Sequence, residues 1–411
     1  MQKVVLLLGK GLLQKFEKHI LKINPALTAV ECGFNLEIPE NYFQNYLNIP
    51  KGEELKSIIE FCKDMEVIGV INRKDYYEKL HGELVDHFQI PGPSFHAVDQ
   101  VSNKANLHQL MEDINLNLFR PRTITCQLAE VQSLLKSVQF PVMIKPFAGA
   151  HSRGVHKLEQ ASDFDEVYPR LYEHFKNEYA IDQLDREDRT VLIEEFLIGK
   201  MVVPICYIDS KYKVHFISLL KVVRAVDVGQ DHYQLIYRTT PSNVRENIQQ
   251  KMRFVLQKIA KASRLKETFL DPEFFVYKDN IYLIEINVRM GGFRQELAMP
   301  AFDIDLEKMI TQLALRQEVD DQFNAVGSAT ACEIWEPKSG IIKKLKLPKS
   351  KHITWSKLNL QEGDFYEAPP EGNHSLGSFY VSAPEKSLSL ARAVRNKMII
   401  EFEDDDSSSY N

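Results

Sequence analysis

The sequence predicts a mixed α/β and α+β fold, with a doubly wound α/β layer at the N-terminus and an antiparallel, β-rich part at the C-terminus. Three observations lead to this prediction. The apolar run Val4–Leu8 ends at the turn Gly9-Lys10-Gly11 and precedes an amphipathic stretch, as in the first strand and helix of a doubly wound layer. Strand-like runs dominate between residues 191 and 288. Past residue 318, glycines punctuate a series of short strand-like segments.

The N-terminal layer is predicted from alternating strand and helix patterns. Strands are expected at Val4–Leu8 and Val67–Ile71, and helices at Leu12–Ile23 and Glu53–Lys63. The turn after the first strand has part of the Gly-x-Gly-x-x-Gly pattern of dinucleotide-binding loops, but Gln14 stands where the third glycine belongs. We therefore expect a tight strand-to-helix turn there, and no nucleotide site.

Composition narrows the range of functions. A chain of 411 residues exceeds what one ordinary core supports, so several subdomains are expected. Its 44% hydrophobic and 26% charged residues are typical of a soluble globular protein, and a net charge of -6 argues against a protein that coats nucleic acid. The five cysteines lie far apart without a Cys-x-x-Cys pair, so neither a zinc site nor a disulfide framework is indicated. With no apolar run long enough to span a membrane, a cytoplasmic location is expected.

The most informative stretch is Glu285-Ile286-Asn287-Val288-Arg289. Alternate side chains of a strand share a face, so Glu285, Asn287 and Arg289 point one way while Ile286 and Val288 point the other. A carboxylate and an amide oxygen suit a hard dication such as Mg²⁺, and the adjacent arginine suits a phosphate or carboxylate held by that ion. This segment therefore predicts a metal site.

A second carboxylate is expected at the same site. Glu273 lies twelve residues before Glu285 in the strand-like run Asp271–Tyr277, and 278–280 is a candidate turn. A three-residue loop would place Glu273 opposite Glu285 on one face, whereas a two-residue loop would put them on opposite faces. Two charges about 4 Å apart at an effective dielectric near 20 repel by roughly 4 kcal/mol, so facing carboxylates need a cation or a shared proton. The alternative is a surface hairpin with solvated acids.

Small and basic residues gather after the strand-like run Phe140–Pro146, which contains Lys145. In the following loop, Gly149–Val155, small residues allow backbone N–H groups to approach phosphate oxygens, while Lys145 and Arg153 supply positive charge. The loop fits neither the Walker A pattern nor Gly-x-Ser-x-Gly. A phosphate-binding lid and an ordinary Gly-containing hairpin both remain open at this point.

A third motif follows in the run Val191–Gly199. It passes from an apolar strand into Glu194 and Glu195 and then Phe196 and Leu197. Backbone groups here could read the edge of an adenine ring between apolar walls, although a buried strand with exposed acids explains the pattern equally well.

The order of these signals resembles the ATP-grasp superfamily from about residue 99 to 320. The front layer resembles the domain that precedes ATP-grasp in biotin carboxylase-like members, and the tail resembles the L-amino-acid ligase and carnosine synthase branch. The motifs that carry the resemblance are, in order, Lys104 at a helix start, Lys145 with its Gly/Ser/Arg loop, Glu-Glu-Phe-Leu with a glycine, Glu273, Glu285, Asn287, Arg289 and Gly291-Gly292.

The resemblance implies a role for each matching residue. The implied nucleotide-binding residues are Lys104, Lys145, Ser152, Arg153, Gly154, Glu194, Glu195, Phe196 and Leu197. The implied ligands of one or two Mg²⁺, for which Mn²⁺ can substitute, are Glu273, Glu285 and Asn287. The implied catalytic residues are Lys145, Arg289, which would steady an acyl phosphate, and Arg294, which would bind a substrate carboxylate.

The implied activity is an ATP-dependent carboxylate-amine ligase that joins small amino-acid substrates through an acyl phosphate and releases ADP and phosphate. One position departs from the family pattern, in which an acid two residues after the hinge glycine binds the ribose hydroxyls: here that position is Met201. Two alternatives stay open: an ATP-binding regulatory module without ligase activity, and an ATP-grasp ligase for a substrate other than an amino acid. A homodimer is the default expectation, with small-molecule substrates and with no nucleic-acid or membrane partner.

The chain is expected to divide into four segments. These are a pre-ATP-grasp α/β domain (1–98), a small lid subdomain (99–190), a large subdomain with the metal site (191–320) and a C-terminal β-rich part (321–411). The acidic run from Glu401 to Ser409 is expected to be disordered.

Overall fold

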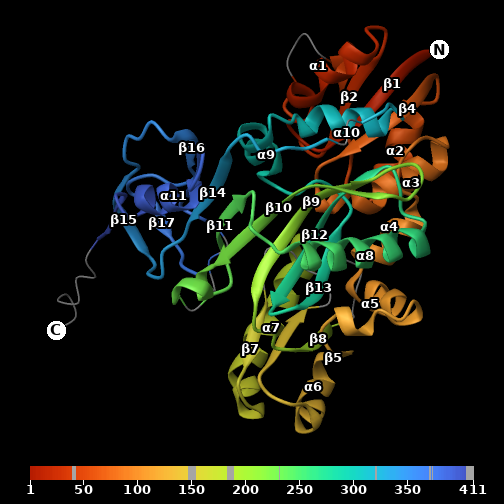
Figure 1. The fold of residues 1–411 in the computed structure, drawn as a ribbon. Helices are drawn as coiled ribbons and strands as arrows, with labels where there is room; N and C mark the ends of the chain where they lie inside the picture. Colours follow the sequence, from red (N-terminus) through yellow and green to blue (C-terminus); the bar gives the residue numbers. More distant parts are fainter. Residues whose placement is uncertain are drawn as a thin grey trace.

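The computed structural model describes residues 1–38, 43–146, 154–182, 189–230, 232–319, 322–369, 372 and 374–403. Figure 1 shows an N-terminal layer (red and orange) at one end, a small sheet (yellow) at the other, and a central sheet between them that continues into the blue C-terminal part. Helix and strand are mixed throughout, as predicted.

The N-terminal layer is a parallel sheet in the order β3-β2-β1-β4. Its strands are β1 (Gln2–Leu8), β2 (Thr28–Gly33), β3 (Tyr46–Asn48) and β4 (Met65–Asn72), and its helices are α1 (Leu13–Ile23), α2 (Glu54–Phe61) and α3 (Glu78–Phe88). The side chains of β1 from Val4 to Leu8 are fully buried, which explains why this strand reads as a continuous apolar run.

The turn between β1 and α1 is closed by the protein itself. The buried carboxylate of Glu31 accepts hydrogen bonds from the backbone N–H of Gly11 at 2.9 Å and of Leu13 at 2.7 Å. The start of the helix, where a phosphate would sit in a dinucleotide fold, therefore already holds an anion. This agrees with the prediction of a structural turn at Gly9-Lys10-Gly11.

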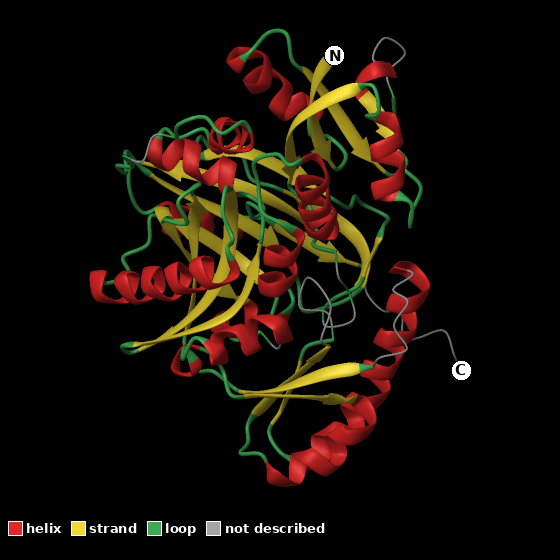
Figure 2. Ribbon diagram, turned by 90° about the vertical axis from the view of Figure 1, so that its right-hand side faces the viewer, coloured by secondary structure: helices red, strands yellow, loops and turns green. Residues whose placement is uncertain are grey.

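The small sheet has the order β5-β8-β6-β7 and its own hydrophobic core. Figure 2 shows a long helix lying along one side of it. Its elements are β5 (Thr123–Gln127), α6 (Val131–Leu134), β6 (Val142–Pro146), β7 (His156–Leu158), α7 (Phe164–Asp182) and β8 (Thr190–Glu195).

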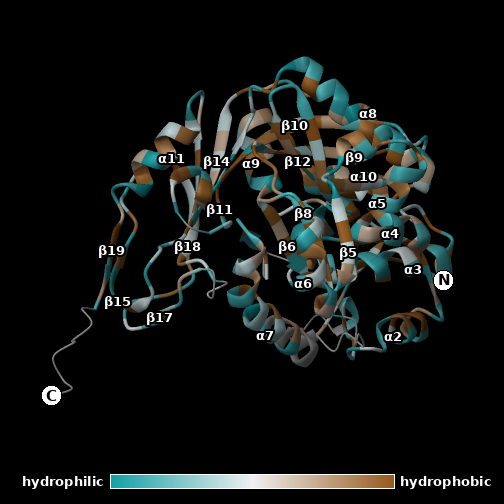
Figure 3. Ribbon diagram, turned by 90° about the horizontal axis from the view of Figure 1, so that it is seen from below, coloured by the Kyte–Doolittle hydropathy of each residue, from teal (hydrophilic) through white to brown (hydrophobic). Residues whose placement is uncertain are grey.

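The central sheet has eight strands in the order β13-β12-β9-β10-β11-β14-β18-β16. Hydrophobic residues concentrate on its strands, whereas the outer helix α8 is more hydrophilic (Figure 3). Helices α4 and α5 pack against this sheet and α8. The elements are α4 (Phe95–Ser102), α5 (Lys104–Asp113), β9 (Lys200–Ile208), β10 (Val214–Arg224), β11 (Leu235–Thr240), α8 (Glu246–Ser263), β12 (Thr268–Tyr277), β13 (Asn280–Asn287), α9 (Arg294–Phe302) and α10 (Leu306–Ala314).

A continuous hydrophobic cluster joins the N-terminal layer to the central sheet. Phe16 and Ile20 of α1 are fully buried in the same cluster as Met309 and Leu313 of α10 and Tyr207 of β9. The N-terminal layer is therefore fixed in place beside the carboxyl end of β13, where the candidate site lies.

The C-terminal strands extend the central sheet and also build a second, three-stranded sheet in the order β17-β15-β19. The elements are β14 (Ser328–Ile334), β15 (Gly340–Lys346), β16 (Ile353–Leu358), β17 (Phe365–Tyr366), β18 (Gly377–Ala383), α11 (Ser387–Arg395) and β19 (Ile399–Phe402). The prediction of disorder from residue 401 is wrong for its first residues, because Glu401 and Phe402 pair with β15. The rest of the acidic run, from residue 404, lies outside the described residues.

Among the helices of the described chain, none combines the length and the apolar character that crossing a membrane requires.

Candidate active site

The hairpin of β12 and β13 brings the predicted metal ligands together. Glu273 is paired with Glu285 and Asp271 with Asn287 across the two strands. Ile286 is fully buried, whereas Glu285 and Asn287 are only partly so. The alternation read from the sequence therefore describes the strand correctly: the polar side chains share one face.

The predicted three-residue loop of this hairpin is wrong. Tyr277 pairs with Asn280, which leaves a two-residue turn. The register then shifts beyond Phe274, which pairs with Leu283, so that Ile284 has no partner of its own. This β-bulge supplies the extra residue that the loop lacks and returns the two carboxylates to the same face.

Lys104 is the cation that this acidic pair already contacts. Its Nζ lies 2.9 Å from Oε2 of Glu285. Burial favours the neutral forms of both groups, but their mutual attraction outweighs it, raising the pKa of Lys104 and lowering that of Glu285. Burial, together with the nearby charges of Glu285 and Asp271, raises the pKa of Glu273.

The donor set fits a hard dication. Among the described residues, no hydrogen bond or ion pair reaches the Glu273 carboxylate, although it faces Glu285 directly. One lysine therefore stands beside two carboxylates and the amide of Asn287. Glu273, Glu285 and Asn287 would hold the ion, since hard cations prefer oxygen ligands of these types.

Lys145 forms the second buried ion pair of the site. Its Nζ lies 2.7 Å from Oε2 of Glu194, and both side chains are buried. The other carboxylate oxygen of Glu194, Oε1, is buried and has no hydrogen-bond partner among the described residues. A buried acceptor of this kind is costly unless a ligand donor completes it, as the amino group of an adenine ring would.

The residues after Glu194 have partly structural contacts. Glu195 binds Arg122 at 2.8 Å, and its backbone N–H donates to the Arg122 carbonyl at 3.0 Å. The N–H of Phe196 donates to the carbonyl of Pro141, and Lys157 Nζ lies 4.2 Å from the Phe196 ring centre. Leu197 is half-buried. These two N–H groups are therefore engaged within the small sheet.

The predicted phosphate loop lies mostly outside the described residues, which end at 146 and resume at 154. Ser152 and Arg153 are among the residues left out. Gly154 is described, with a φ of +67° that favours glycine.

Asp271 organises the two predicted arginines, and the sequence-based assignment overlooked it. Arg294 is buried and donates to Asp271 Oδ1 from Nη2 at 2.7 Å and to the carbonyl of Gly292 from Nη1 at 3.0 Å. Arg289 Nη1 lies 3.6 Å from Asp271 Oδ2. The signal that could have revealed Asp271 is its two-residue spacing from Glu273, which places both acids on one face of β12.

The described contacts of Arg294 are thus all internal to the protein. Its predicted role in binding a substrate carboxylate stays a prediction. Arg289 reaches the N-terminal layer as well, since its Nε donates to Asp75 and lies 3.8 Å from Glu78 Oε1.

His108 is a further neighbour that the sequence analysis missed. It follows Lys104 by one turn of α5 and is buried, and its Nε2 has no hydrogen-bond partner in the part of the chain that the structure describes. Burial lowers its pKa to about 4, although Glu194 acts in the opposite direction. The imidazole is therefore neutral near pH 7, and the i, i+4 spacing from Lys104 was the available signal.

Met201 is buried in β9 within the hydrophobic cluster, so the position offers no group for a ribose hydroxyl. Arg224, another basic residue near this strand, pairs with Asp227 at 2.8 Å and stacks 4.6 Å from the Phe275 ring centre.

A second cluster with metal-binding residue types lies elsewhere, between α1 and α10. It consists of His19, Asp305 and Glu307. Lys15 and Arg73 lie 3.7 and 3.9 Å from the Glu307 carboxylate and balance the acidic charge. This cluster is an ion-pair contact between the N-terminal layer and the central domain.

Comparison with known proteins identifies the domain. Residues 138–296 match the ATP-grasp domain family. The chain is 23% identical over 287 residues to the uncharacterized protein y4rH of Sinorhizobium fredii, covering 68% of this chain and 55% of that protein. It is 24% identical over 196 residues to a D-alanine–D-alanine ligase of Campylobacter concisus, covering 47% and 52%. The chain thus spans about half the length of these two relatives.

Solved structures extend the likeness to the whole chain. An L-amino acid ligase from Bacillus licheniformis superimposes with a TM-score of 0.78 at 14% identity, covering 98% of this chain and 99% of that one. The biotin carboxylase of Campylobacter jejuni gives 0.66 at 17% identity, covering 97% and 92%. The chain therefore contains an ATP-grasp domain and has the ATP-grasp fold. At these identities the structural likeness establishes the fold alone.

Replacing Glu285 by alanine should lower turnover by at least about 100-fold, because the change removes a metal ligand and leaves Lys104 without its partner. Glu401→Ala, a strand glutamate of β19 far from the site, is the matched control. Circular dichroism and the urea unfolding midpoint should show that both variants fold. Wild-type rates in Glu285→Ala would contradict the metal assignment.

Mg²⁺ affinity should increase with pH. The raised pKa of Glu273 means that the folded, metal-free protein keeps a proton on this carboxyl above its ordinary pKa of 4.5, and the metal must displace that proton. Calorimetric Mg²⁺ titrations at about pH 6, 7 and 8, in buffers of different ionisation enthalpy, would show proton release that declines as the pH rises. Glu273→Gln should bind more weakly and lose the dependence. A pH-independent affinity in the unchanged protein would rule this explanation out.

Gly291 should not tolerate a side chain. A Cβ atom there would overlap the Asp271 carboxylate, whereas a Cβ at Gly292 would meet nothing within 4 Å. Gly291→Ala should lower the free energy of unfolding by about 1–3 kcal/mol, and Gly292→Ala by clearly less. Urea denaturation measures both, and equal effects would show that Asp271 does not set the space at this loop.

Proposed function

We propose that the protein is an ATP-dependent, Mg²⁺-requiring ligase that joins a carboxylate to an amine and releases ADP and phosphate. The observation that carries this proposal is the pairing of Glu273 with Glu285 beside Asn287 and Lys104, on the ATP-grasp fold. Each lysine of the site lies beside a carboxylate. This arrangement suits a substrate that brings both phosphates and a metal ion.

The nucleotide would lie between the small sheet and the central sheet. Glu194 supports this placement, because its Oε1 is buried and receives no donor from the described part of the chain. Lys145 and Lys104 would bind the phosphates, and Ser152, Arg153 and Gly154 are the further residues proposed to bind the nucleotide. Phe196 and Leu197 would form the apolar walls around the base.

In the first step, an oxygen of the substrate carboxylate attacks the γ-phosphorus of ATP, and the bond to the β-phosphate oxygen breaks to release ADP. In the second step, the amine nitrogen attacks the carbonyl carbon of the acyl phosphate, phosphate leaves, and the amine loses a proton. The chain contributes alignment and charge: Lys145 and Arg289 neutralise the oxygens on which negative charge develops. Bound Mg²⁺, one or two ions, would supply further neutralisation at the phosphates.

Amino acids are the proposed substrates. The support is the agreement of the whole chain with the L-amino acid ligase of Bacillus licheniformis, together with the sequence similarity to D-alanine–D-alanine ligases. A carboxylate and an amine on small molecules are the two groups that such a reaction needs. The four segments predicted from the sequence and a homodimer in the cytoplasm belong to the same proposal.

Met201 is the observation that favours a second candidate function, an ATP-binding module without ligase activity. Its burial leaves the usual ribose-binding position without an acid. Such a module would gain thermal stability from ATP and Mg²⁺ but form no ADP with any substrate pair.

A pairwise amino-acid screen that measures ADP and phosphate release should find pairs that support turnover, with a condensed product of matching mass. Hydroxylamine supplied in place of the amine should give the hydroxamate of the carboxylate substrate, because it intercepts an acyl phosphate. Glu285→Ala is the control, because any ADP formed in its presence measures the background from contaminating ATPases. Stabilisation by MgATP with no ADP from any amino-acid pair would reject the amino-acid ligase and favour the module or a different substrate class.

A further inference from the structure

We propose that the N-terminal layer takes part in the active site by holding the catalytic Arg289 in position through Asp75. Asp75 is a positioning residue in this scheme, since it acts on the reaction through Arg289. The inference rests on the proposed function only for its kinetic consequence, because the contact itself is independent of the reaction.

The guanidinium of Arg289 is bound through two of its three nitrogens. Its Nε donates to Asp75, and its Nη1 donates to the carbonyl of Met290 at 3.3 Å and lies 3.6 Å from Asp271. Among the described residues, no hydrogen bond is made by Nη2. This nitrogen is therefore the one that remains for a phosphate or carboxylate oxygen, and Asp75 fixes the orientation of the planar group that carries it.

Local structure explains why two acids of the N-terminal layer reach Arg289. Strand β4 ends at Asn72, whose side chain accepts from the Lys74 N–H at 2.8 Å and donates to the Lys74 carbonyl at 2.9 Å. The chain then enters the 3-10 turn η2 (Asp75–Tyr77), which continues directly into α3. Asp75 and Glu78 are three residues apart, and residues at this spacing share one helical face.

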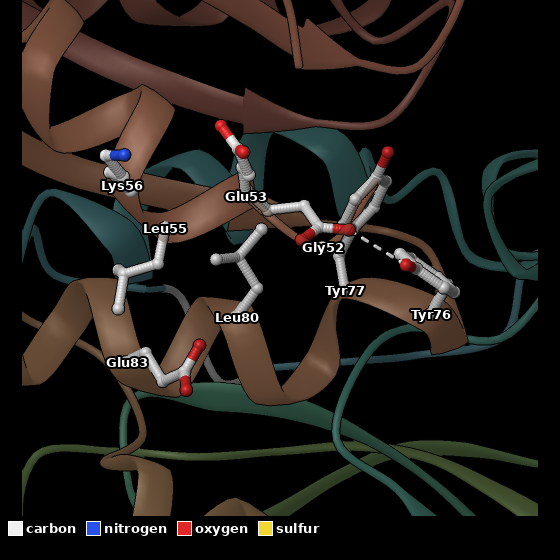
Figure 4. Close-up of a pocket in the computed structure, with 9 residues that line it drawn as sticks. Gly52, Glu53, Leu55, Lys56, Tyr76, Tyr77, Leu80 and Glu83 are labelled. Atoms are coloured by element: carbon white, nitrogen blue, oxygen red, sulfur yellow. Dashed lines mark hydrogen bonds between the residues drawn. The ribbon is translucent and has the colours of Figure 1, made fainter. Parts of the chain in front are cut away.

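The back of this turn is anchored, which keeps Asp75 from moving away. Tyr76 donates from its hydroxyl to Glu54 at 2.9 Å, the contact drawn as a dashed line in Figure 4. The rings of Phe34, Tyr76 and Tyr77 contact one another with centroids 5.1–5.6 Å apart. Both tyrosines also line a hollow of about 500 Å³ together with residues of α2 and α3.

Charge makes the contact specific for a cation at position 289. Three acids, Asp75, Glu78 and Asp271, surround two arginines, and Arg294 is already engaged by Asp271. Glu78 is buried, and its Oε1 has no hydrogen-bond partner within the described ranges. Burial raises the pKa of Glu78 to about 8 against the opposing effect of Arg289. Arg289 is the cation within 4 Å of this carboxylate in the described part of the chain.

The kinetic test compares Asp75→Ala and Asp75→Asn with Arg289→Lys. Asp75→Ala should lower kcat by about 10- to 100-fold, because the arginine loses its orientation, while KM for ATP changes by less than about threefold. Asp75→Asn, which retains an acceptor oxygen, should recover part of the loss. In the Arg289→Lys background, Asp75→Ala should cause little further loss. The matched control is Asp64→Ala, an exposed acid of the same layer. Full kcat in Asp75→Ala, or additive losses in the double variant, would overturn the positioning role while leaving the ligase proposal intact.

A second test needs no activity. Urea unfolding midpoints are measured for Asp75→Ala, Arg289→Gln and the double variant. Asp75→Ala alone should lower the midpoint, because it removes a partner of Arg289. Without Arg289, the carboxylates of Asp75 and Asp271 repel each other, so adding Asp75→Ala to Arg289→Gln should raise the midpoint. A lower midpoint in the double variant than in Arg289→Gln would show that Asp75 and Arg289 do not act as a pair, whatever the reaction proves to be.

Discussion

The repulsion between Glu273 and Glu285 is the constraint on which the candidate site depends. The hairpin holds the two carboxylates opposite each other in a partly buried place, where unpaired negative charge is costly. Lys104, at the start of α5, forms an ion pair with Glu285. Asn103 caps this helix by accepting hydrogen bonds from the backbone N–H groups of Ala105 and Asn106, which fixes the position of Lys104. The packing of α5 on the central sheet thus serves the charge balance of the hairpin.

The same principle extends outward from the hairpin through Asp271. Asp271 lies on the same face of β12 as Glu273 and forms ion pairs with Arg294 and Arg289. Gly291 leaves room for its carboxylate. Arg289 carries the network into the N-terminal layer at Asp75. Acids of the hairpin and of the N-terminal turn are therefore paired with the two arginines that flank the glycine loop. The hydrophobic packing of the N-terminal layer on the central sheet sets the geometry of this charge network.

Periodicity made part of this arrangement predictable. Alternation placed Glu285 and Asn287 on one face, and counting residues paired Glu273 with Glu285. The reason for the pairing was nevertheless wrong, because a bulge at Ile284 replaced the expected loop residue, and bulges leave no clear pattern in one sequence. Asp75 could not have been found, since its contact with Arg289 joins residues 214 positions apart. Such contacts follow from how layers pack, and a single sequence carries little information about that packing.

Both lysines of the site are paired with acids before any nucleotide is considered, and this bears on how substrate would enter. Lys104 and Lys145 neutralise Glu285 and Glu194, so phosphate alone would have to strip each lysine from a buried carboxylate. In the proposed reaction the nucleotide would arrive with its metal: phosphate oxygens would take the lysines, the dication would take the acids of the hairpin, and an adenine amino group would donate a hydrogen bond to Glu194. The exchange at the hairpin would then be balanced, because a cation replaces Lys104 beside Glu285. Ion pairs of this kind would therefore favour the metal-nucleotide complex over either component by itself.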